Sequence, residues 1–493
     1  MALLFPRLPA LPLERYSALL SAEAMQRVMD RVAGLRARLS GRVVWNVSST
    51  AAGGGVAEMV RSLLAYARGA GVDARWAVIQ GTPAFFRITK RLHNAIHGSL
   101  GDGSDLGDAE RHVYEQVNAD NAVELSAMVR PGDIVIVHDP QPAGTIPALL
   151  ARGAHVAWRC HIGHDQLNDE VGRGWQFIAP YIRDAHAFVF SRPSYAPGNL
   201  LDARRAFVIP PTIDPFSAKN QALDGTCMRA ILNHAGLIQS TVTEPRTFML
   251  EDGSPGRVDR TADVIRDGPP PPETTPLVVQ VSRWDRLKDP FGVLHGFARL
   301  DEARARGAHL VLAGPSAAGV NDDPEGASVL ASVIDEWRHL PDDIRKRIHI
   351  ASLPVVEVDE NAAIVNALQR HATVIVQKSL HEGFGLTVTE AMWKARPVIA
   401  SAVGGIQDQI DNGVQGLLLQ DPTDLDAFAV AVARLLANPA EAQQMGARGH
   451  AHVLERYLGL YSLLRYGSLI EWLDEGGAQV PLSMAPAPPA IDS

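Results

Sequence analysis

Short apolar segments alternate with helical segments along this chain, and they do so in two separate series. The apolar segments of the first series are residues 43–49, 74–80, 133–139, 155–162, 185–191 and 206–211. Those of the second series are residues 276–283, 308–315, 348–354, 372–379 and 396–405. Strands that alternate with helices form parallel sheets with helices on both faces. The pattern therefore predicts an α/β fold with two Rossmann-like, doubly wound domains, in which ligands bind at the carboxyl ends of the strands.

The length of 493 residues also favours two domains, because a single hydrophobic core stops growing well below this size. We expect an N-terminal Rossmann-like domain over residues 1–215 and a C-terminal one over residues 276–455. Between them, residues 218–238 can form a helix, and residues 251–275 contain many Gly, Pro, Asp and Thr residues. Residues 216–275 are therefore expected to be a linker or insertion that is partly flexible. Residues 456–475 are expected to form a helix that packs back on the N-terminal domain. The Pro- and Ala-rich tail, residues 480–493, is expected to be disordered.

The charge and the cysteine count narrow the class of protein. A net charge of −9 argues against a nucleic-acid partner, which usually requires a basic surface. The two cysteines, Cys160 and Cys227, form neither a disulfide framework nor a metal motif, so we expect no metal site and a reducing, cytoplasmic location. No signal-peptide core and no apolar run of membrane-spanning length is evident, which predicts no membrane partner.

Three consecutive glycines, residues 53–55, follow the first apolar segment and precede a helix expected to begin near Val56. The pattern is neither GxGxxG nor a P-loop. Backbone N–H groups at a helix N-terminus can bind an anion. A tight turn that only relieves crowding explains the glycines equally well.

The second series carries charged residues at two strand ends. Arg283 and Lys288 follow one strand, where two cations can bind a diphosphate, although taken alone this pair is better explained as ordinary exposed charge. Glu382 is expected at the end of a later strand, before a glycine-broken turn and a helix beginning near Leu386. Glu390, eight residues after Glu382, can hold a diol such as a ribose, or can compensate the helix dipole at the surface.

Two histidines lie at strand ends of the first series. His138 and Asp139 follow one strand, and His161 follows the next. Each His taken alone is best explained by structural hydrogen bonding. Two such sites on one sheet edge shift the balance toward a ligand site that binds sugar hydroxyls.

Together these motifs resemble the retaining glycosyltransferases of the GT-B fold, family 4, in which two Rossmann-like domains face each other across a cleft. The E-x7-E pair, the two cations and the first glycine turn carry this resemblance. Longer segments are similar to the branch of trehalose glycosyltransferring synthases: VSSTAAGGGVAEMV, GTPAFFRITKRLHNAIHG, HDPQP, WRCHI, PPTIDPFSAKN, VSRWDRLKDPFGV and EGFGLTVTEAMWKARPVIAS. Enzymes of that branch join glucose from a nucleoside-diphosphate glucose to free glucose and form α,α-trehalose. Residues 241–275 depart from the compact form of the family.

The resemblance implies a role for each matching residue. As catalytic residues it implies Arg283 and Lys288 on the leaving diphosphate, Glu382 on the donor glucose and His161 near the reaction centre. Glu390 would bind the ribose, while Asp139 and His138 would lie on the acceptor side. Backbone N–H groups would hold the distal phosphate and the donor sugar, from Gly54, Gly55, Gly383, Phe384, Gly385 and Leu386.

The implied partners are a UDP-, ADP- or GDP-glucose donor and a glucose acceptor, and a homodimer is compatible with the sequence. No cofactor is required, and Mg²⁺ at most stimulates. Several alternatives remain open: a trehalose phosphorylase, another disaccharide-forming enzyme on the same scaffold, or a non-catalytic nucleotide-sugar sensor. A dinucleotide oxidoreductase is disfavoured, because the first turn lacks GxGxxG.

Overall fold

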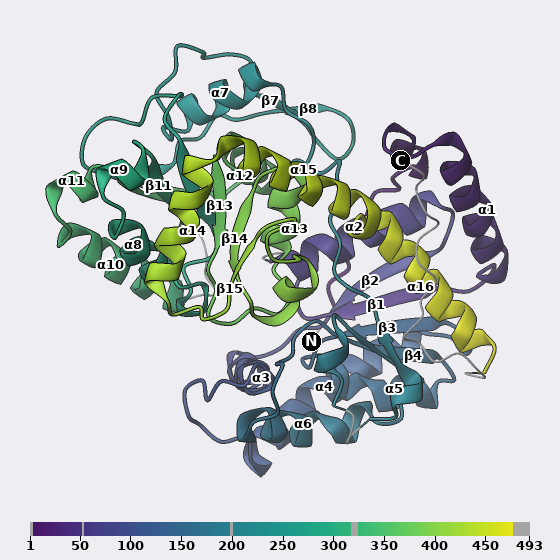
Figure 1. The fold of residues 1–493 in the computed structure, drawn as a ribbon. Coiled ribbons are helices and arrows are strands. Elements are labelled where there is room, and N and C mark those ends of the chain that lie inside the picture. Colours follow the sequence, from purple (N-terminus) through teal and green to yellow (C-terminus); the bar gives the residue numbers. More distant parts are fainter. Residues whose placement is uncertain (1–2, 52–53, 198–200, 317–323, 477–493) are drawn as a thin grey trace. The chain divides into compact units, whose positions relative to one another are not determined.

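A computed structural model describes residues 3–51, 54–197, 201–316 and 324–476 of the chain, and the expected disordered tail lies outside them. The chain divides into two compact units (Figure 1). The first comprises Met1–Thr212 and Glu455–Ser493, and the second comprises Ile213–Leu454. None of the helices in the described ranges is long and apolar enough to cross a membrane.

The first unit contains a parallel sheet that, in the described residues, has six strands in the order β2-β1-β3-β4-β5-β6. Its strands are β1 (Val44–Ser48), β2 (Ala74–Val78), β3 (Ile134–His138), β4 (His155–Cys160), β5 (Ala187–Phe190) and β6 (Ala206–Val208). Each lies within an apolar segment predicted from the sequence. The prediction of a parallel sheet over this part of the chain is confirmed.

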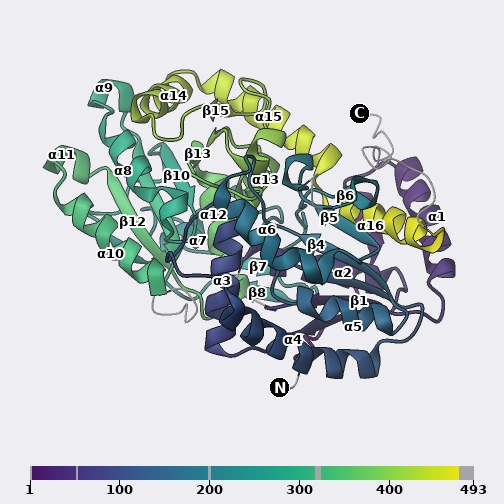
Figure 2. The same ribbon diagram turned by 90° about the horizontal axis from the view of Figure 1, so that it is seen from below.

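Helices cover both faces of this sheet. They are α1 (Ala22–Arg38), α2 (Gly55–Gly69), α3 (Pro83–Ile96), α4 (Asp108–Met128), α5 (Ile146–Ala151), α6 (Asp169–Ile182) and α16 (Gly459–Asp474). Alternate strand residues face opposite layers, so Val135 and Val137 pack with α3 to α6 while Ile134 and Ile136 pack with α2 and α16. Figure 2 shows α3 to α6 side by side. Arg42 and Asp474 form a 2.8 Å ion pair that attaches the end of α16 to this unit.

The second unit contains a sheet with the order β15-β14-β13-β10-β11-β12-β9 in the described residues. Its parallel strands are β10 (Leu277–Val281), β11 (His309–Pro315), β12 (Ile348–Leu353), β13 (Val374–Gln377), β14 (Val398–Ser401) and β15 (Leu417–Leu419). Its helices are α7 (Gly225–His234), α8 (Pro290–Ala298), α9 (Glu302–Ala305), α10 (Pro324–Arg338), α11 (Asp342–Arg345), α12 (Val358–His371), α13 (Leu386–Trp393), α14 (Leu425–Ala437) and α15 (Pro439–Arg456). One apolar core joins the sheet to α8, α10 and α14.

The segment expected to be a linker, residues 216–275, is part of the second unit. It forms α7, the antiparallel pair β7 (Thr247–Met249) and β8 (Pro255–Arg257), and β9 (Asp263–Ile265). β9 pairs antiparallel with β12 and so closes one edge of the sheet. The helix α7 lies within residues 218–238, where the sequence allows a helix, whereas the short strands β7, β8 and β9 were not predicted. Tertiary strand pairing orders such short segments even though their own sequence pattern is weak.

Strand order creates one switch point in each sheet. The chain moves from β1 to β2 in one direction and from β3 to β6 in the other, so the neighbours β1 and β3 have diverging connections. β10 and β13 are neighbours of the same kind in the second sheet. Ligands of doubly wound sheets bind at the carboxyl ends of such strand pairs.

Candidate active site

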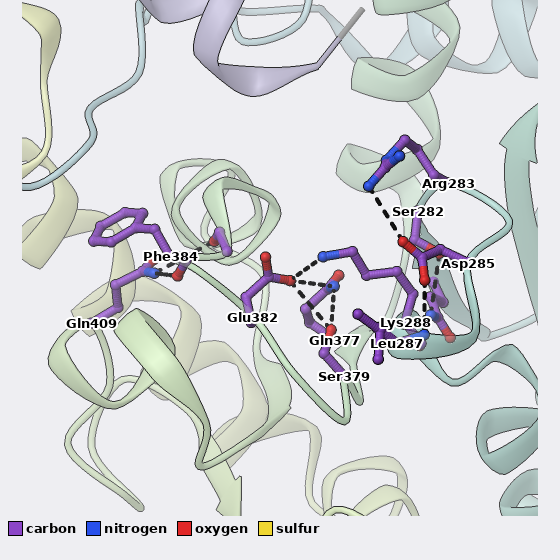
Figure 3. A network of polar contacts seen from close by, with 12 residues as sticks. Ser282, Arg283, Asp285, Leu287, Lys288, Gln377, Ser379, Glu382, Phe384 and Gln409 are labelled. Atoms are coloured by element: carbon purple, nitrogen blue, oxygen red, sulfur yellow. Dashed lines mark hydrogen bonds and ion pairs between the residues drawn. The ribbon is translucent and has the colours of Figure 1, made fainter. Parts of the chain in front are cut away.

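The loop after β10 carries both predicted cations. Arg283 lies two residues beyond the strand, its side chain is 54% exposed, and its Nη2 lies 3.3 Å from Oδ2 of Asp285. The other carboxylate oxygen of Asp285 accepts a 2.8 Å hydrogen bond from the N–H of Leu287 and so shapes the loop. Figure 3 shows Arg283 and Lys288 on either side of this carboxylate.

Lys288 and Glu382 meet across the switch point of the second sheet. Nζ of Lys288 lies 2.6 Å from Oε2 of Glu382, which also accepts hydrogen bonds from Gln377 Nε2 at 3.4 Å and Ser379 Oγ at 3.3 Å (Figure 3). The two charged side chains are 18% and 12% exposed. The expectation that Glu382 ends a strand is wrong, since β13 ends at Gln377 and Glu382 lies in the loop before α13. This loop can bend Glu382 back onto the loop after β10.

The turn before α13 presents a helix N-terminus at the same edge. α13 begins at Leu386, as predicted, after Gly385 in the left-handed region at φ 84°. The amide of Gln409 donates to the carbonyl oxygens of Phe384 and Gly385, and Thr389 donates to Gln409 at 2.7 Å. These bonds engage the carbonyl groups of the turn. The first N–H groups of a helix have no partner inside the helix, so this turn is suited to an anion or to sugar hydroxyls.

Glu390 lies in the second turn of α13 and is buried. Its Oε1 forms a 3.1 Å ion pair with Nζ of Lys219. The alternative of a dipole-compensating surface residue is therefore wrong for Glu390. A buried carboxylate requires a partner, and here the partner comes from residues that precede α7 in the chain.

In the first unit, the glycine turn leads into α2, which begins at Gly55. Gly53 lies outside the described residues. Gly54 is the N-cap residue, with φ 109° and ψ 162°, a conformation that essentially only glycine adopts. A Cβ atom at Gly54 would meet nothing within 4 Å. Backbone conformation, and not crowding, therefore requires glycine at this position.

His138 and His161 form one buried hydrogen-bonded chain. Arg159 Nε donates to His161 Nδ1 at 3.4 Å, so the proton of a neutral His161 is on Nε2. That proton is donated to His138 Nδ1 at 2.9 Å, and His138 Nε2 then donates to Asn46 Oδ1 at 2.8 Å. Burial, with Arg159 nearby, lowers the pKa of His138 to about 3 and that of His161 well below its ordinary value. Both rings are neutral near pH 7 and are held in one orientation.

Asp139 follows β3 with a left-handed backbone, φ 64°. Its Oδ1 accepts the backbone N–H of His161 at 2.8 Å, which joins the loops after β3 and β4. Burial raises the pKa of Asp139 to about 6, although the His161 N–H and Arg159 lower it. The residue is half-buried and follows the end of β3, so it lies at the carboxyl edge of the first sheet, where ligands bind.

Comparison with known proteins identifies the family. Residues 46–197 match the N-terminal domain family of trehalose synthase, and residues 262–452 match the glycosyl transferases group 1 family. The trehalose synthase of Pyrococcus horikoshii is 33% identical over 465 residues, covering 94% of this chain and 96% of that protein. The chain belongs to the trehalose synthase family. The trehalose synthase of Rubrobacter xylanophilus is 36% identical over 426 residues, covering 86% of this chain and 89% of that protein.

This trehalose synthase family member is a hexosyltransferase with the GT-B fold, as the sequence predicts. The trehalose 6-phosphate synthase structure from Burkholderia multivorans has a TM-score of 0.63 and 17% identity, covering 89% of this chain and all of that chain. At that identity the likeness shows the fold alone. The trehalose phosphorylase of Pleurotus pulmonarius is 26% identical, and the match covers 82% of this chain but 54% of that protein.

Sequence reasoning missed the residues that support the predicted site of this trehalose synthase homologue. Asn46 and Gln377 are buried polar residues of otherwise apolar strands. A polar residue in an apolar segment is detectable in the sequence and could have indicated that these side chains have polar partners. Arg159 lies in the segment WRCHI, two residues before His161, and Ser379 is the last residue of the apolar segment 372–379, three residues before Glu382. Lys219 lies in the segment PPTIDPFSAKN, which carries part of the resemblance, but its pairing with Glu390, 171 positions away in the chain, could not be predicted locally.

Proposed function

We propose that this protein transfers glucose from a nucleoside-diphosphate glucose to free glucose, with retention, and so forms α,α-trehalose in a reversible reaction. The proposal rests on one observation above all. Lys288, Glu382 and the N-terminus of α13 converge at the switch point of the second sheet, beside Arg283. Membership of the trehalose synthase family supports the choice of sugars.

In the second unit we assign Arg283 and Lys288 to the diphosphate of the donor. Negative charge develops on this group as the bond from glucose C1 to the phosphate oxygen breaks. Two cations stabilise that charge more in the transition state than in the ground state, and this difference accelerates the reaction. Glu382 would accept hydrogen bonds from hydroxyl groups of the donor glucose while it holds the Lys288 ammonium in place.

In the first unit we assign Asp139 to the acceptor glucose. Its carboxylate would accept a hydrogen bond from a hydroxyl group of the acceptor, and the backbone N–H of His161 fixes the orientation of the carboxylate. His138 and His161 position this loop edge through their chain to Asn46. The role of Gly54 and Gly55, N–H groups toward the distal phosphate, stays a prediction.

Retention of configuration would follow from a front-face substitution. The acceptor oxygen forms its bond to C1 on the face from which the phosphate oxygen departs, and the leaving phosphate oxygen takes the acceptor proton. Both ring nitrogens of His161 have protein partners, so this step assigns no base role to that ring.

No cofactor is part of this proposal, because Arg283 and Lys288 can neutralise the leaving group, and Mg²⁺ is at most stimulatory. We therefore expect dialysis against a chelator to leave more than about half of the turnover, a small change beside the orders of magnitude that a catalytic metal supplies. The initial rate before and after EDTA, with Mg²⁺ added back as the control, measures this. A loss of about a hundredfold that Mg²⁺ restores would contradict it.

A trehalose phosphorylase is the second candidate, since such enzymes are more distant relatives. It would use inorganic phosphate and glucose 1-phosphate and would need no ribose contact. The buried carboxylate of Glu390 favours a nucleotide, because a carboxylate binds a diol well.

One experiment separates these possibilities. The protein is incubated with UDP-, ADP- or GDP-glucose, with and without glucose, and products are identified by NMR. An α,α-1,1 linkage that forms only with both substrates supports the proposal. Turnover that requires phosphate and no nucleotide would favour the phosphorylase, and nucleotide binding without turnover would favour a sensor.

A further inference from the structure

Lys219 lies in a short segment that is fixed to the helices around Glu390. The carbonyl oxygen of Asn220 accepts the indole N–H of Trp393 at 3.0 Å. Asn366 of α12 donates to the carbonyl oxygen of Ala218 at 3.1 Å, and Arg370 donates to that of Asn220 at 2.8 Å. The backbone on both sides of Lys219 is therefore anchored to α12 and α13.

Two lysines surround Glu390, and they make different contacts. Nζ of Lys394 lies 2.9 Å from Oδ1 of Asn220 and 3.2 Å from the backbone carbonyl oxygen of Glu390. Nζ of Lys219 instead lies 3.1 Å from the carboxylate oxygen Oε1. Burial lowers the pKa of Lys394 to about 7, while the Glu390 carboxylate raises it. Lys219 is thus the cation that faces the carboxylate directly.

The exposure of the pair suits a binding site. The side chain of Glu390 is 6% exposed and that of Lys219 is 24% exposed, so the pair lies at the edge of the solvent. A carboxylate has about four acceptor positions. A single ammonium contact leaves acceptor positions for two hydroxyl groups, while it limits the rotation of the carboxylate.

We propose that Lys219 is a positioning residue of the donor site, which holds the Glu390 carboxylate in the orientation that accepts hydrogen bonds from the ribose hydroxyls of the nucleotide. The inference rests on the proposed function, because it requires a ribonucleotide donor. It adds a residue from the start of the second unit to the donor site.

The test is a double-mutant-type cycle, in which removal of the lysine side chain is combined with removal of the ribose 2′-hydroxyl and the affinity is measured for each combination. Calorimetry compares ADP with 2′-deoxy-ADP, and UDP with 2′-deoxy-UDP, on the wild type and on Lys219→Met. We expect the substitution to weaken binding of the ribonucleotide about tenfold, which corresponds to one charge-assisted contact. Binding of the deoxynucleotide should change by less than about twofold. Glu390→Gln should remove the same preference.

Matched variants separate positioning from folding. Both nucleotides are measured on the same protein, so a loss of stability cancels in the ratio of their affinities. Lys219→Arg should restore most of the preference for the ribonucleotide. Lys346→Met is the control, because Lys346 is exposed and adjoins α11, far from α13 within the unit in both ribbon views.

Three outcomes would overturn the proposal. Equal losses for both nucleotides in Lys219→Met would show a structural role only and would leave the proposed function intact. If Lys219→Met binds both nucleotides as tightly as the wild type, the inference is also refuted, and the proposed function again stays intact. A wild type that binds no nucleoside diphosphate would instead contradict the proposed function, and the inference would fall with it.

Discussion

Replacement of Arg283 by Ala should separate turnover from stability. The guanidinium is 54% exposed, and its ion pair with Asp285 spans 3.3 Å. Exposed pairs of this kind contribute about 0–1 kcal/mol to the free energy of unfolding. The same group placed on a leaving diphosphate contributes about 2.7–4 kcal/mol to the transition state, which is a factor of about 10²–10³ in turnover.

Single-turnover release of nucleoside diphosphate and trehalose measures the effect on turnover, and urea unfolding measures the effect on the free energy of unfolding. Arg286→Ala is the control, since Arg286 is an exposed arginine in the same loop, with its guanidinium 5.8 Å from the ring of Phe291. We expect that variant to keep turnover within about threefold of the wild type, because Arg286 has no assigned contact with the diphosphate and a surface substitution usually has a small effect. Near-normal turnover of Arg283→Ala would show that Arg283 does not stabilise the leaving diphosphate. A loss of stability of several kcal/mol would show that the loop contact is structural.

Three further predictions follow from the described contacts. Gly54→Ala should lower the free energy of unfolding by about 1–3 kcal/mol through its backbone conformation, whereas Gly172→Ala, which also meets no atom within 4 Å, should cost nothing; equal urea midpoints for the two would refute this. With an Asp139 pKa of about 6, kcat/KM for glucose should fall as the pH drops through 6, because protonation removes the carboxylate acceptor; Asp139→Asn should lose this step, and its persistence would exclude Asp139. Lys378→Met should destabilise by about 3–5 kcal/mol in urea, because it leaves Asp289 without its buried ion-pair partner, and a cost below about 1 kcal/mol would disprove that.

The elements with a strong local pattern were predictable. Each apolar strand segment and the starts of α2 and α13 were located from periodicity and glycine placement alone. The three-residue strands β7, β8, β9 and β15 were missed, although β6, which is equally short, was located. The helix expected over residues 456–475 corresponds to α16, which begins at Gly459 after α15 ends at Arg456. The chain passes from the second unit to the first near this break.

The sequence by itself determined the α/β class, the family and the residue types at each strand end, because these depend on local periodicity and short motifs. Only the tertiary structure decided which strand ends are neighbours. β10 and β13 are about a hundred residues apart along the chain, and their adjacency places Lys288 against Glu382. In the same way, Lys219 reaches Glu390 because residues 218–221 pack on α12 and α13. Such pairings arise from long-range packing and hydrogen bonding, to which no local sequence pattern refers.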